Sequence, residues 1–310
     1  MNRKNYIINQ AVKEKEKLIK IILIIVAVFI LYCLIEMIRE LWDFRVTKYR
    51  ICSPKLNEIK GTKKIIFLSD LHNRMYGKEN EHLLESIKNQ HPDLILIGGD
   101  MLVRKDGNSY DGTVRFLEKL PAICPVYCAN GNHEQKLKEL PDKYEQSYEE
   151  YKKALTACGI HMLENVSETV RLDEASVRIS GLEIPLRAYA RFGKKELPLK
   201  EIADRIGEHG GEYQILLAHH PGYMKEYLEY GADLILGGHY HGCVVQLPGI
   251  GGVISPNFTL FPKYSGGIYR EGSQTAVVSR GLGTHSVPVR LWNWPELIVL
   301  ELTGTSEKCE

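Results

Sequence analysis

The stretch DLILGGHYHG (residues 233–242) joins a short apolar run to a glycine-flanked turn that carries two histidines. A short apolar run bounded by turn residues is typical of a buried strand, and glycine lets the backbone turn tightly after it. We therefore predict a strand that ends in a polar turn. Alternate side chains on a tight turn diverge, so His239 and His241 can serve different partners while Tyr240 points away. Those partners must come from other parts of the chain.

The same succession of strand, polar turn and helix occurs five times. Apolar runs also lead into polar turns in the segments KIIFLSDLHN (64–73), PDLILIGGD (92–100), ICPVYCANGNHE (123–134) and YQILLAHHP (213–221). Segments with helical spacing, such as KENEHLLESIKNQ (78–90), lie between them. This alternation predicts an α/β domain whose functional residues lie at the carboxyl ends of its strands.

Each of the five expected strand ends carries side chains that bind metals. The candidates are Asp70, His72, Asp100, Asn132, His133, His219, His220, His239 and His241. A single aspartate at such a position is most often a cap or turn residue, but five successive ends of this kind are hard to explain that way. Carboxylate, amide oxygen and imidazole together suit Mn²⁺, Fe, Zn²⁺ or Co²⁺. There are too many groups for one tetrahedral zinc, and they suit two ions about 3.5–4 Å apart.

The ordered blocks DLH, GGD, GNHE, AHHP and GHYH resemble those of the calcineurin-like metallophosphoesterases, over about residues 62–303. The tail VSRGLGTHSVPVRLWNWPEL (278–297) is similar to that of membrane-anchored bacterial members. The resemblance implies a four-layer αββα sandwich, an α/β (α+β) fold. It also implies hydrolysis of a phosphodiester or pyrophosphate bond in a lipid-linked substrate, such as a UDP-diacylglucosamine-type molecule.

The resemblance also implies roles for individual residues. The ligands of one ion would be Asp70, His72 and His241, and those of the other Asn132, His219 and His239. Asp100 would bridge the two ions, which is why we count it as catalytic. Two cations lower the pKa of a bridging water, so that hydroxide attacks phosphorus in line. His133 would bind no metal but would face the phosphate and protonate the leaving oxygen.

Several neighbours of these blocks have alternative roles. Glu134 either orients His133 or lies on the solvated surface, and His220, which precedes a proline, is expected to be structural. The family's last block usually continues with Gly-Gln where this chain has Cys243-Val244. That departure bears on the substrate and not on the metals. For Cys243 a small packed residue is favoured over a thiolate.

Three further features have both a structural and a functional interpretation. Arg280 and Arg290 either make structural hydrogen bonds, which we favour, or contact a phosphate or lipid head group. The loop PNFTLFPKY (256–264) carries Phe258, Leu260 and Phe261. It either packs as an ordinary loop, which we favour, or dips into a membrane surface.

The N-terminal part differs in composition from the rest. Residues 21–35, IILIIVAVFILYCLI, contain no charge, and apolar residues extend the run to 18–38. We predict a transmembrane signal anchor at 18–38, after a basic segment at 1–17. A linker at 39–61, the phosphoesterase domain at 62–303 and a tail at 304–310 would follow. The alternative for 18–38 is a buried helix of the domain.

Basic residues on both sides of the expected span affect its orientation. Those before it are Arg3, Lys4, Lys13, Lys15 and Lys17, which favour a cytoplasmic N-terminus and an extracytoplasmic domain. Arg39, Arg45, Lys48 and Arg50 follow the span and keep the cytoplasmic face open as an alternative. The seven cysteines are scattered, and unpaired thiols favour the cytosol.

Composition limits the partners of the chain. The 310 residues include 40 basic and 39 acidic ones, a net charge of +1, which gives no footprint for nucleic acid. We therefore expect no nucleic acid as partner, while the resemblance implies a phosphoester substrate and the apolar segment at 18–38 implies a membrane. The oligomeric state is not predicted. A non-catalytic metal-binding scaffold on the same fold and a protein phosphatase are the alternative functions.

Overall fold

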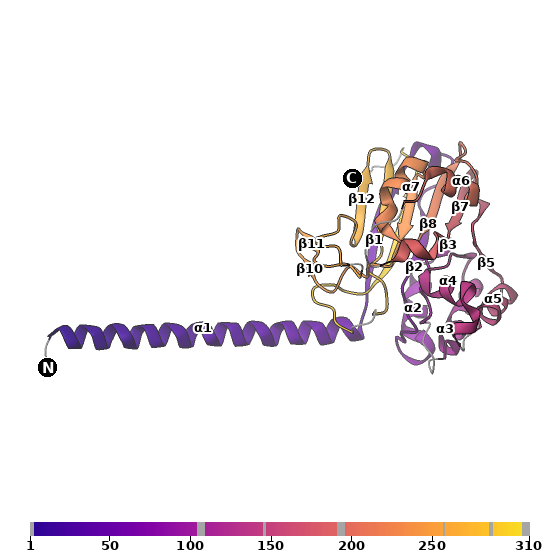
Figure 1. The fold of residues 1–310 in the computed structure, drawn as a ribbon. Coiled ribbons are helices and arrows are strands. Elements are labelled where there is room, and N and C mark those ends of the chain that lie inside the picture. Colours follow the sequence, from indigo (N-terminus) through magenta and orange to yellow (C-terminus); the bar gives the residue numbers. More distant parts are fainter. Residues whose placement is uncertain are drawn as a thin grey trace.

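A 40-residue helix, α1 (Arg3–Trp42), projects from a domain built on two β-sheets (Figure 1). The computed structural model describes residues 3–103, 109–144, 147–190, 196–256, 258–284 and 288–305, with backbone alone for 3–11. Parts of the expected segments 1–17, 256–264, 278–297 and 304–310 lie outside these ranges.

Each large sheet has six strands. The first has the order β1 (Arg45–Cys52), β14 (Glu296–Thr303), β2 (Lys63–Leu68), β3 (Leu94–Ile97), β4 (Val126–Cys128) and β5 (Ile160–Met162). The second has the order β12 (Gly267–Glu271), β13 (Gln274–Val278), β9 (Leu234–Gly237), β8 (Tyr213–Ala218), β7 (Ala175–Leu182) and β6 (Val166–Leu172). A separate two-stranded ribbon consists of β10 (Gln246–Leu247) and β11 (Gly251–Gly252).

Helices cover the outer faces of the two sheets. The α-helices of the domain are α2 (Glu81–Asn89), α3 (Asp111–Leu117), α4 (Asn132–Glu139), α5 (Tyr148–Ala157), α6 (Leu199–Ile206) and α7 (Met224–Tyr230). Short 3-10 turns are η1 (Pro54–Leu56), η2 (Lys78–Asn80), η3 (Leu120–Ala122), η4 (Pro141–Lys143), η5 (Leu186–Tyr189) and η6 (Pro221–Tyr223).

Three apolar cores hold these layers together. The central core lies between the sheets and includes Phe67, Leu217 and Leu236. A second core packs α2, α3 and α5 on the first sheet, and a third packs α6 and α7 on the other. Strands β2, β3, β8 and β9 are buried on both faces, which explains their continuous apolar runs. The predicted four-layer αββα sandwich is confirmed.

The expected linker at 39–61 was wrong. Helix α1 continues to Trp42, and β1 pairs in parallel with β14 from Arg45↔Glu296 to Cys52↔Thr303. The first sheet has β1 at its edge, where alternate charged side chains such as Lys48 and Arg50 remain in solvent. Charges are common on edge strands because they discourage pairing with other chains. That charge content hid the strand in the sequence.

The apolar part of α1 is exposed. Residues Val12–Trp42 are long and apolar enough to cross a membrane, and none of the most apolar window is buried against the domain. The alternative of a buried helix is therefore wrong, since Leu23, Ile24 and Ile25 are each more than 60% exposed. Cys52 is disulfide-bonded, so the expectation of unpaired thiols fails at that position.

Candidate metal centre

Five strand ends meet at one edge of the sandwich, three from the first sheet and two from the second. The turns after β2, β3 and β4 carry the expected residues of the first half of the chain, and those after β8 and β9 carry the histidines of the second half. Every candidate at these ends is buried: Asp70, His72, Asp100, Asn132, His133, His219, His220, His239 and His241. The topology thus gathers side chains that are up to 171 positions apart, from Asp70 to His241.

One group consists of Asp70, His72 and His241, whose ligand atoms are close enough to hold a cation. The Nε2 atoms of His72 and His241 are 2.9 Å apart. His241 Nε2 is 3.2 Å from Asp70 Oδ1, and His72 Nε2 is 3.9 Å from the same oxygen. Nitrogen and oxygen lone pairs therefore point at a common volume.

The second group consists of Asp100, His219 and His239. His219 Nε2 lies 3.2 Å from Asp100 Oδ2. The same Asp100 oxygen is 3.8 Å from His72 Nε2, in the first group. Asp100 therefore lies between the two groups, where one carboxylate can reach both.

Several buried atoms of the centre lack partners. Within the described residues, Asn132 Oδ1 and both ring nitrogens of His239 have no hydrogen-bond partner. A buried polar group without a partner costs roughly 1–3 kcal/mol. The opposite ring nitrogens of two other histidines are fixed: His219 Nδ1 contacts Gly98 O at 2.8 Å and His241 Nδ1 contacts Gly283 O at 3.2 Å. Such contacts orient imidazoles that bind metals, so the donor set fits divalent cations.

The backbone at this edge is strained. Asp70, His72, Asp100, His239 and His241 all have positive φ, between 48° and 62°. Residues with a side chain avoid this region, at a cost on the order of 1 kcal/mol each. Strain at five positions of one cluster persists because the surrounding sheets hold the turns. It aims the side chains inward.

Glycines bring the turns into contact. A Cβ atom at Gly131 would lie 2.2 Å from Asp100 Oδ1, and one at Gly238 would lie 2.2 Å from Asp70 Oδ2. Any larger residue would displace these carboxylates. The glycines in GGD, GNHE and GGHYHG therefore provide close approach as well as turning.

The charges of the centre depend on one another. Burial alone would raise the pKa of Asp70, but His241 and His219 hold it well below its usual range. His219 and His133 likewise outweigh burial and lower the pKa of Asp100. Burial and the neighbouring imidazole of His241 lower the pKa of His72. Ionised carboxylates and neutral imidazoles are the forms that bind metals.

His133 borders the centre. Its backbone N–H donates to Asp100 Oδ1 at 2.7 Å, and its ring centroid is 4.8 Å from that of His72. The N-terminus of α4 thereby holds one oxygen of Asp100 and leaves the other directed at His72 and His219.

Comparison with known proteins agrees with this arrangement. Residues 63–243 match the model of the calcineurin-like phosphoesterase family. The chain belongs to this family. Its members are metal-dependent hydrolases of phosphoester bonds, and this chain is accordingly a metallophosphoesterase.

Individual relatives extend over most of the chain. It is 30% identical over 247 residues to the uncharacterized metallophosphoesterase YkuE of Bacillus subtilis, covering 78% of this chain and 80% of that one. It is 26% identical over 262 residues to the phosphodiesterase YaeI of Escherichia coli, covering 84% and 88%. Among solved structures, TT1561 of Thermus thermophilus is similar with a TM-score of 0.45 and 13% identity, over 71% of this chain and 90% of that one.

The solvated surface role considered for Glu134 was wrong. Glu134 is buried, and its carboxylate accepts backbone N–H groups of Asp100 at 2.8 Å, Met101 at 2.8 Å and Gly131 at 3.0 Å. It therefore ties the turn after β3 to the turn after β4. The sequence holds one signal for this, because Glu134 is the third residue of α4, where carboxylates reach back to backbone N–H groups.

Sequence reasoning also missed Ser69 and Asn293. The Ser69 hydroxyl donates to Asp70 Oδ2 at 2.6 Å. Asn293 Nδ2 donates to the carbonyls of His241, at 2.7 Å, and of Cys243, at 2.5 Å. Asn293 is 52 positions from His241, and no local pattern connects them.

Cys243, which stands where the family usually has glycine, is a packed side chain. Cys243 is 4% exposed, and burial raises the pKa of its thiol to about 12. A Cβ atom at Gly252 would lie 2.4 Å from its sulfur, so the two residues fill one small space. Gln246 Nε2 donates to Gly242 O at 2.7 Å and is also structural.

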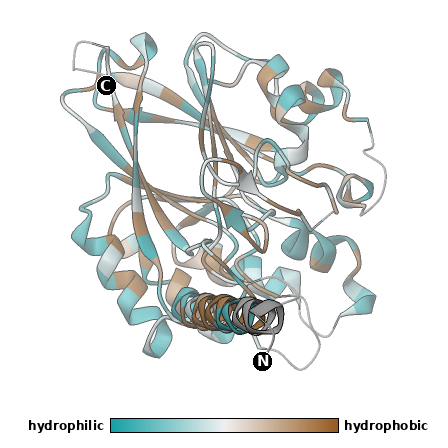
Figure 2. Cartoon of the chain, turned by 90° about the vertical axis from the view of Figure 1, so that its left-hand side faces the viewer, coloured by the Kyte–Doolittle hydropathy of each residue, from teal (hydrophilic) through white to brown (hydrophobic). Residues whose placement is uncertain are grey.

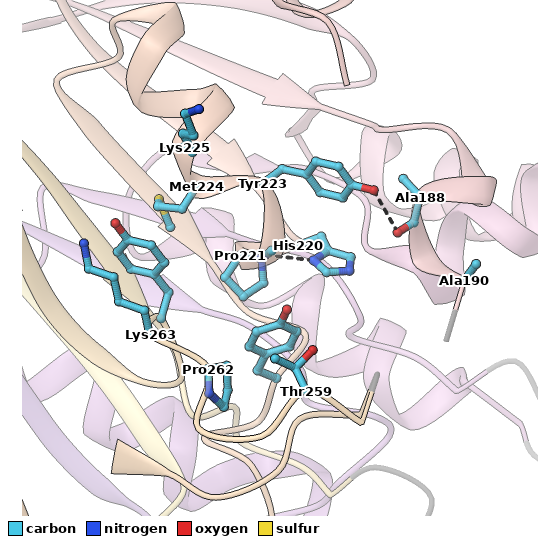
Figure 3. Close-up of a pocket in the computed structure, with 13 residues that line it drawn as sticks. Ala188, Ala190, His220, Pro221, Tyr223, Met224, Lys225, Thr259, Pro262 and Lys263 are labelled. Carbon is cyan, nitrogen blue, oxygen red and sulfur yellow. Dashed lines mark hydrogen bonds between the residues drawn. The ribbon is translucent and has the colours of Figure 1, made fainter. Parts of the chain in front are cut away.

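A cavity of about 360 Å³ opens beside the centre (Figure 3). Its wall includes His220, Tyr240 and Thr259. The ring centroid of His220 is 4.5 Å from that of His239, so the cavity adjoins the second group of metal-binding residues. His220 Nδ1 accepts the N–H of Gly222 at 3.0 Å, in line with the structural role expected for it.

Proposed function

We propose that this chain is a phosphodiesterase with two metal ions at the strand-end edge. One ion would be held by Asp70, His72 and His241, and the other by Asn132, His219 and His239, with Asp100 shared. The observation that carries this proposal is the convergence of buried imidazole and carboxylate groups in which Asn132 Oδ1 and both His239 nitrogens, among the described residues, have no partner. The ions themselves are expected to be Mn²⁺, iron or Zn²⁺.

Bound cations supply Lewis acidity, neutralise phosphoryl charge and lower the pKa of water. The chain's contribution is preorganisation. Asp70 is held by Ser69 and by the backbone N–H of His239, at 3.0 Å. Asp100 is held by the N–H of His133. Fixed carboxylates need no reorganisation during the reaction, which favours rapid turnover.

His133 is the proposed general acid. It lies beside His72 and Asp100 in a third group of three potential ligands, and it is the second residue of α4. An imidazole within reach of the leaving oxygen can donate a proton to it.

The proposed substrate is a lipid-linked phosphodiester or pyrophosphate, such as a UDP-diacylglucosamine-type molecule. The relative YaeI is named a phosphodiesterase, and α1 is long and apolar enough to cross a bilayer. The proposed orientation places the domain outside the cytoplasm. The disulfide at Cys52 supports it, because disulfides persist in oxidising compartments.

The test uses the full chain in detergent with Mn²⁺ and a soluble aryl phosphodiester. We expect hydrolysis by the wild type and by Asp142→Ala, which alters an exposed carboxylate, and none by Asp100→Ala. The metal content of each protein is measured in parallel. A chain that binds two ions but hydrolyses neither monoesters nor diesters would be a scaffold. A chain active on phosphopeptides alone would be a protein phosphatase.

A further inference from the structure

Helix α1 does not leave the domain at its last residue. The ring of Phe29 is 6.4 Å from that of Trp292, between centroids. Cys33, Glu36 and Met37 on the following turns are half-buried, and Glu40 is fully buried. The distance from Phe29 to the end of α1 is about 20 Å. Since Phe29 belongs to the uncharged run 21–35, part of the domain lies level with the membrane-spanning segment.

The junction has a fixed geometry. The Glu40 carboxylate accepts the N–H of Asn293 at 3.0 and 3.1 Å. Arg74 donates to the carbonyl of Leu41, and the guanidinium of Arg45 lies 3.9 Å from the ring centroid of Trp294. The domain therefore presents one constant face to the bilayer. Figure 2 views the molecule from the side on which α1 projects, with the helix seen nearly end-on at the edge of the domain.

A backbone network extends from Trp292 across this face. Leu291 exchanges hydrogen bonds with Val244 and Gln246, both 3.1 Å long. Val253 donates to Val245 at 3.0 Å, and Phe261 donates to Val253 at 2.9 Å. We call residues 244–256, 258–261 and 291–292 the apolar platform. It includes β10 and β11, which lie on the side of the domain from which α1 projects (Figure 1).

The platform exposes large apolar side chains. Ile250 is 66% exposed, Leu260 65% and Phe261 54%. On a soluble surface such residues occur singly, whereas several together mark an interaction site. Because the network connects them to Trp292, which contacts the spanning helix, the surface nearest to them is the bilayer. The sequence favoured an ordinary packed loop. In the structure, however, the described part of the chain does not cover these side chains.

The same loop forms a wall of the cavity beside the metal centre. Thr259 and Pro262 line the cavity, while Leu260 and Phe261, between them, are exposed. Lys225 and Lys263 also line it. One loop thus has an outward apolar side and an inward side toward the cavity.

We propose that the apolar platform is a bilayer-docking surface. Ile250, Leu260 and Phe261 lie in the boundary between head groups and acyl chains, about 5–10 Å deep. The cavity beside His220 then opens onto the head groups of the same leaflet. Docking itself follows from the position of α1, while the delivery of lipid phosphodiesters to the cavity rests on the proposed function.

The first test needs no catalysis. Full-length Leu260→Trp is reconstituted into phosphatidylcholine–phosphatidylglycerol vesicles with brominated acyl chains, and the emission of the wild type, with its three tryptophans, is subtracted. Val166→Trp is the matched control, since Val166 is 44% exposed on β6, at the opposite edge of the second sheet from β12. Bromine should quench the added emission of Leu260→Trp and leave that of Val166→Trp unchanged. Equal emission of Leu260→Trp with and without bromine overturns the proposal, whatever the enzyme hydrolyses.

The second test is a ratio of rates. For Leu260→Asp and Val166→Asp, hydrolysis of a vesicle-borne phosphodiester is divided by hydrolysis of a soluble aryl diester. We expect the ratio to fall about tenfold for Leu260→Asp. Loss of one apolar side chain from the interface weakens binding of the domain to the vesicle by about tenfold, so less of the vesicle-borne substrate is hydrolysed. It should stay at the wild-type value for Val166→Asp. A ratio that is equal in both variants contradicts docking at this loop.

Discussion

The metal centre and the cluster that joins α1 to the domain are both buried and polar, yet their groups are partnered differently. In the junction cluster, defined as Glu40, Arg290 and Asn293, the guanidinium of Arg290 is 2% exposed. It donates to carbonyls of Asn293 at 3.1 Å and Arg280 at 2.8 Å, and also to Gly283. In the metal centre, His239 has no hydrogen-bond partner for either ring nitrogen among the described residues.

Backbone conformation separates the two clusters as well. Five candidate ligands in the metal centre have positive φ, whereas Glu40, Arg290 and Asn293 are not among the described non-glycine residues with positive φ. Among the described residues, the junction cluster leaves Asn293 Oδ1 without a partner but satisfies the guanidinium and the carboxylate internally, so its contacts stabilise the fold. A cluster that combines strained turns with unpartnered atoms gains its partners from a ligand.

The largest effect should come from the shared carboxylate. Asp100→Ala is expected to lower turnover on the order of 10⁴-fold, or about 5–6 kcal/mol, because both cations lose a ligand. Metal-free stability should fall by a smaller amount, about 1–3 kcal/mol, because the N–H of His133 loses its buried acceptor. Steady-state rates and denaturant unfolding without metal test both parts. Turnover within tenfold of wild type would show that Asp100 is dispensable.

The junction should respond in the opposite way. Arg290→Met is expected to lower the free energy of unfolding by about 3–5 kcal/mol, because several buried carbonyls lose their donor and nearby carboxylates lose a cation. Denaturant unfolding of the full chain in detergent measures it. Arg171→Met is the control, since that side chain is 70% exposed. Equal stability of the two variants would remove the distinction between the clusters.

Added metal should stabilise the folded protein only by binding at the metal centre. At a concentration of Mn²⁺ about 100 times its Kd, the wild type should gain about 2.7 kcal/mol of unfolding free energy for each ion bound. Arg290→Met should keep this gain, and Asp100→Ala should lose most of it. Thermal unfolding with and without chelator provides the comparison. A gain that survives in Asp100→Ala would place the metal elsewhere.

The smallest effect is expected in a comparison of two adjacent histidines, His219 and His220. His220 caps η6 through its Nδ1, so His220→Gln should cost about 1 kcal/mol of stability and leave metal binding intact. His219→Gln should abolish binding at the second ion. Titration with Mn²⁺ monitored by calorimetry distinguishes them. Loss of one ion in both variants would assign His220 to the centre as well.

Most of the candidate centre was predictable because each ligand turn follows its own strand. Asp70, Asp100 and His239 belong to segments in which three or four apolar residues lead into glycine or serine, a pattern that local residues determine. The surface role considered for Glu134 was wrong because its partners lie 32 to 34 positions away. The expected linker was wrong because β1 gains its partner, β14, from about 250 positions further along.

By itself, the sequence determined the apolar segment, the alternation of strands and helices and the residues with metal-binding chemistry, because periodicity and residue type are local properties. The four-layer arrangement was implied only by the family resemblance. Only the tertiary structure decided which atoms lack partners, how α1 is fixed by Glu40 and Asn293, and that Leu260 and Phe261 are exposed. Those properties depend on contacts between distant segments. Their energies arise only when the two sheets have brought the segments together.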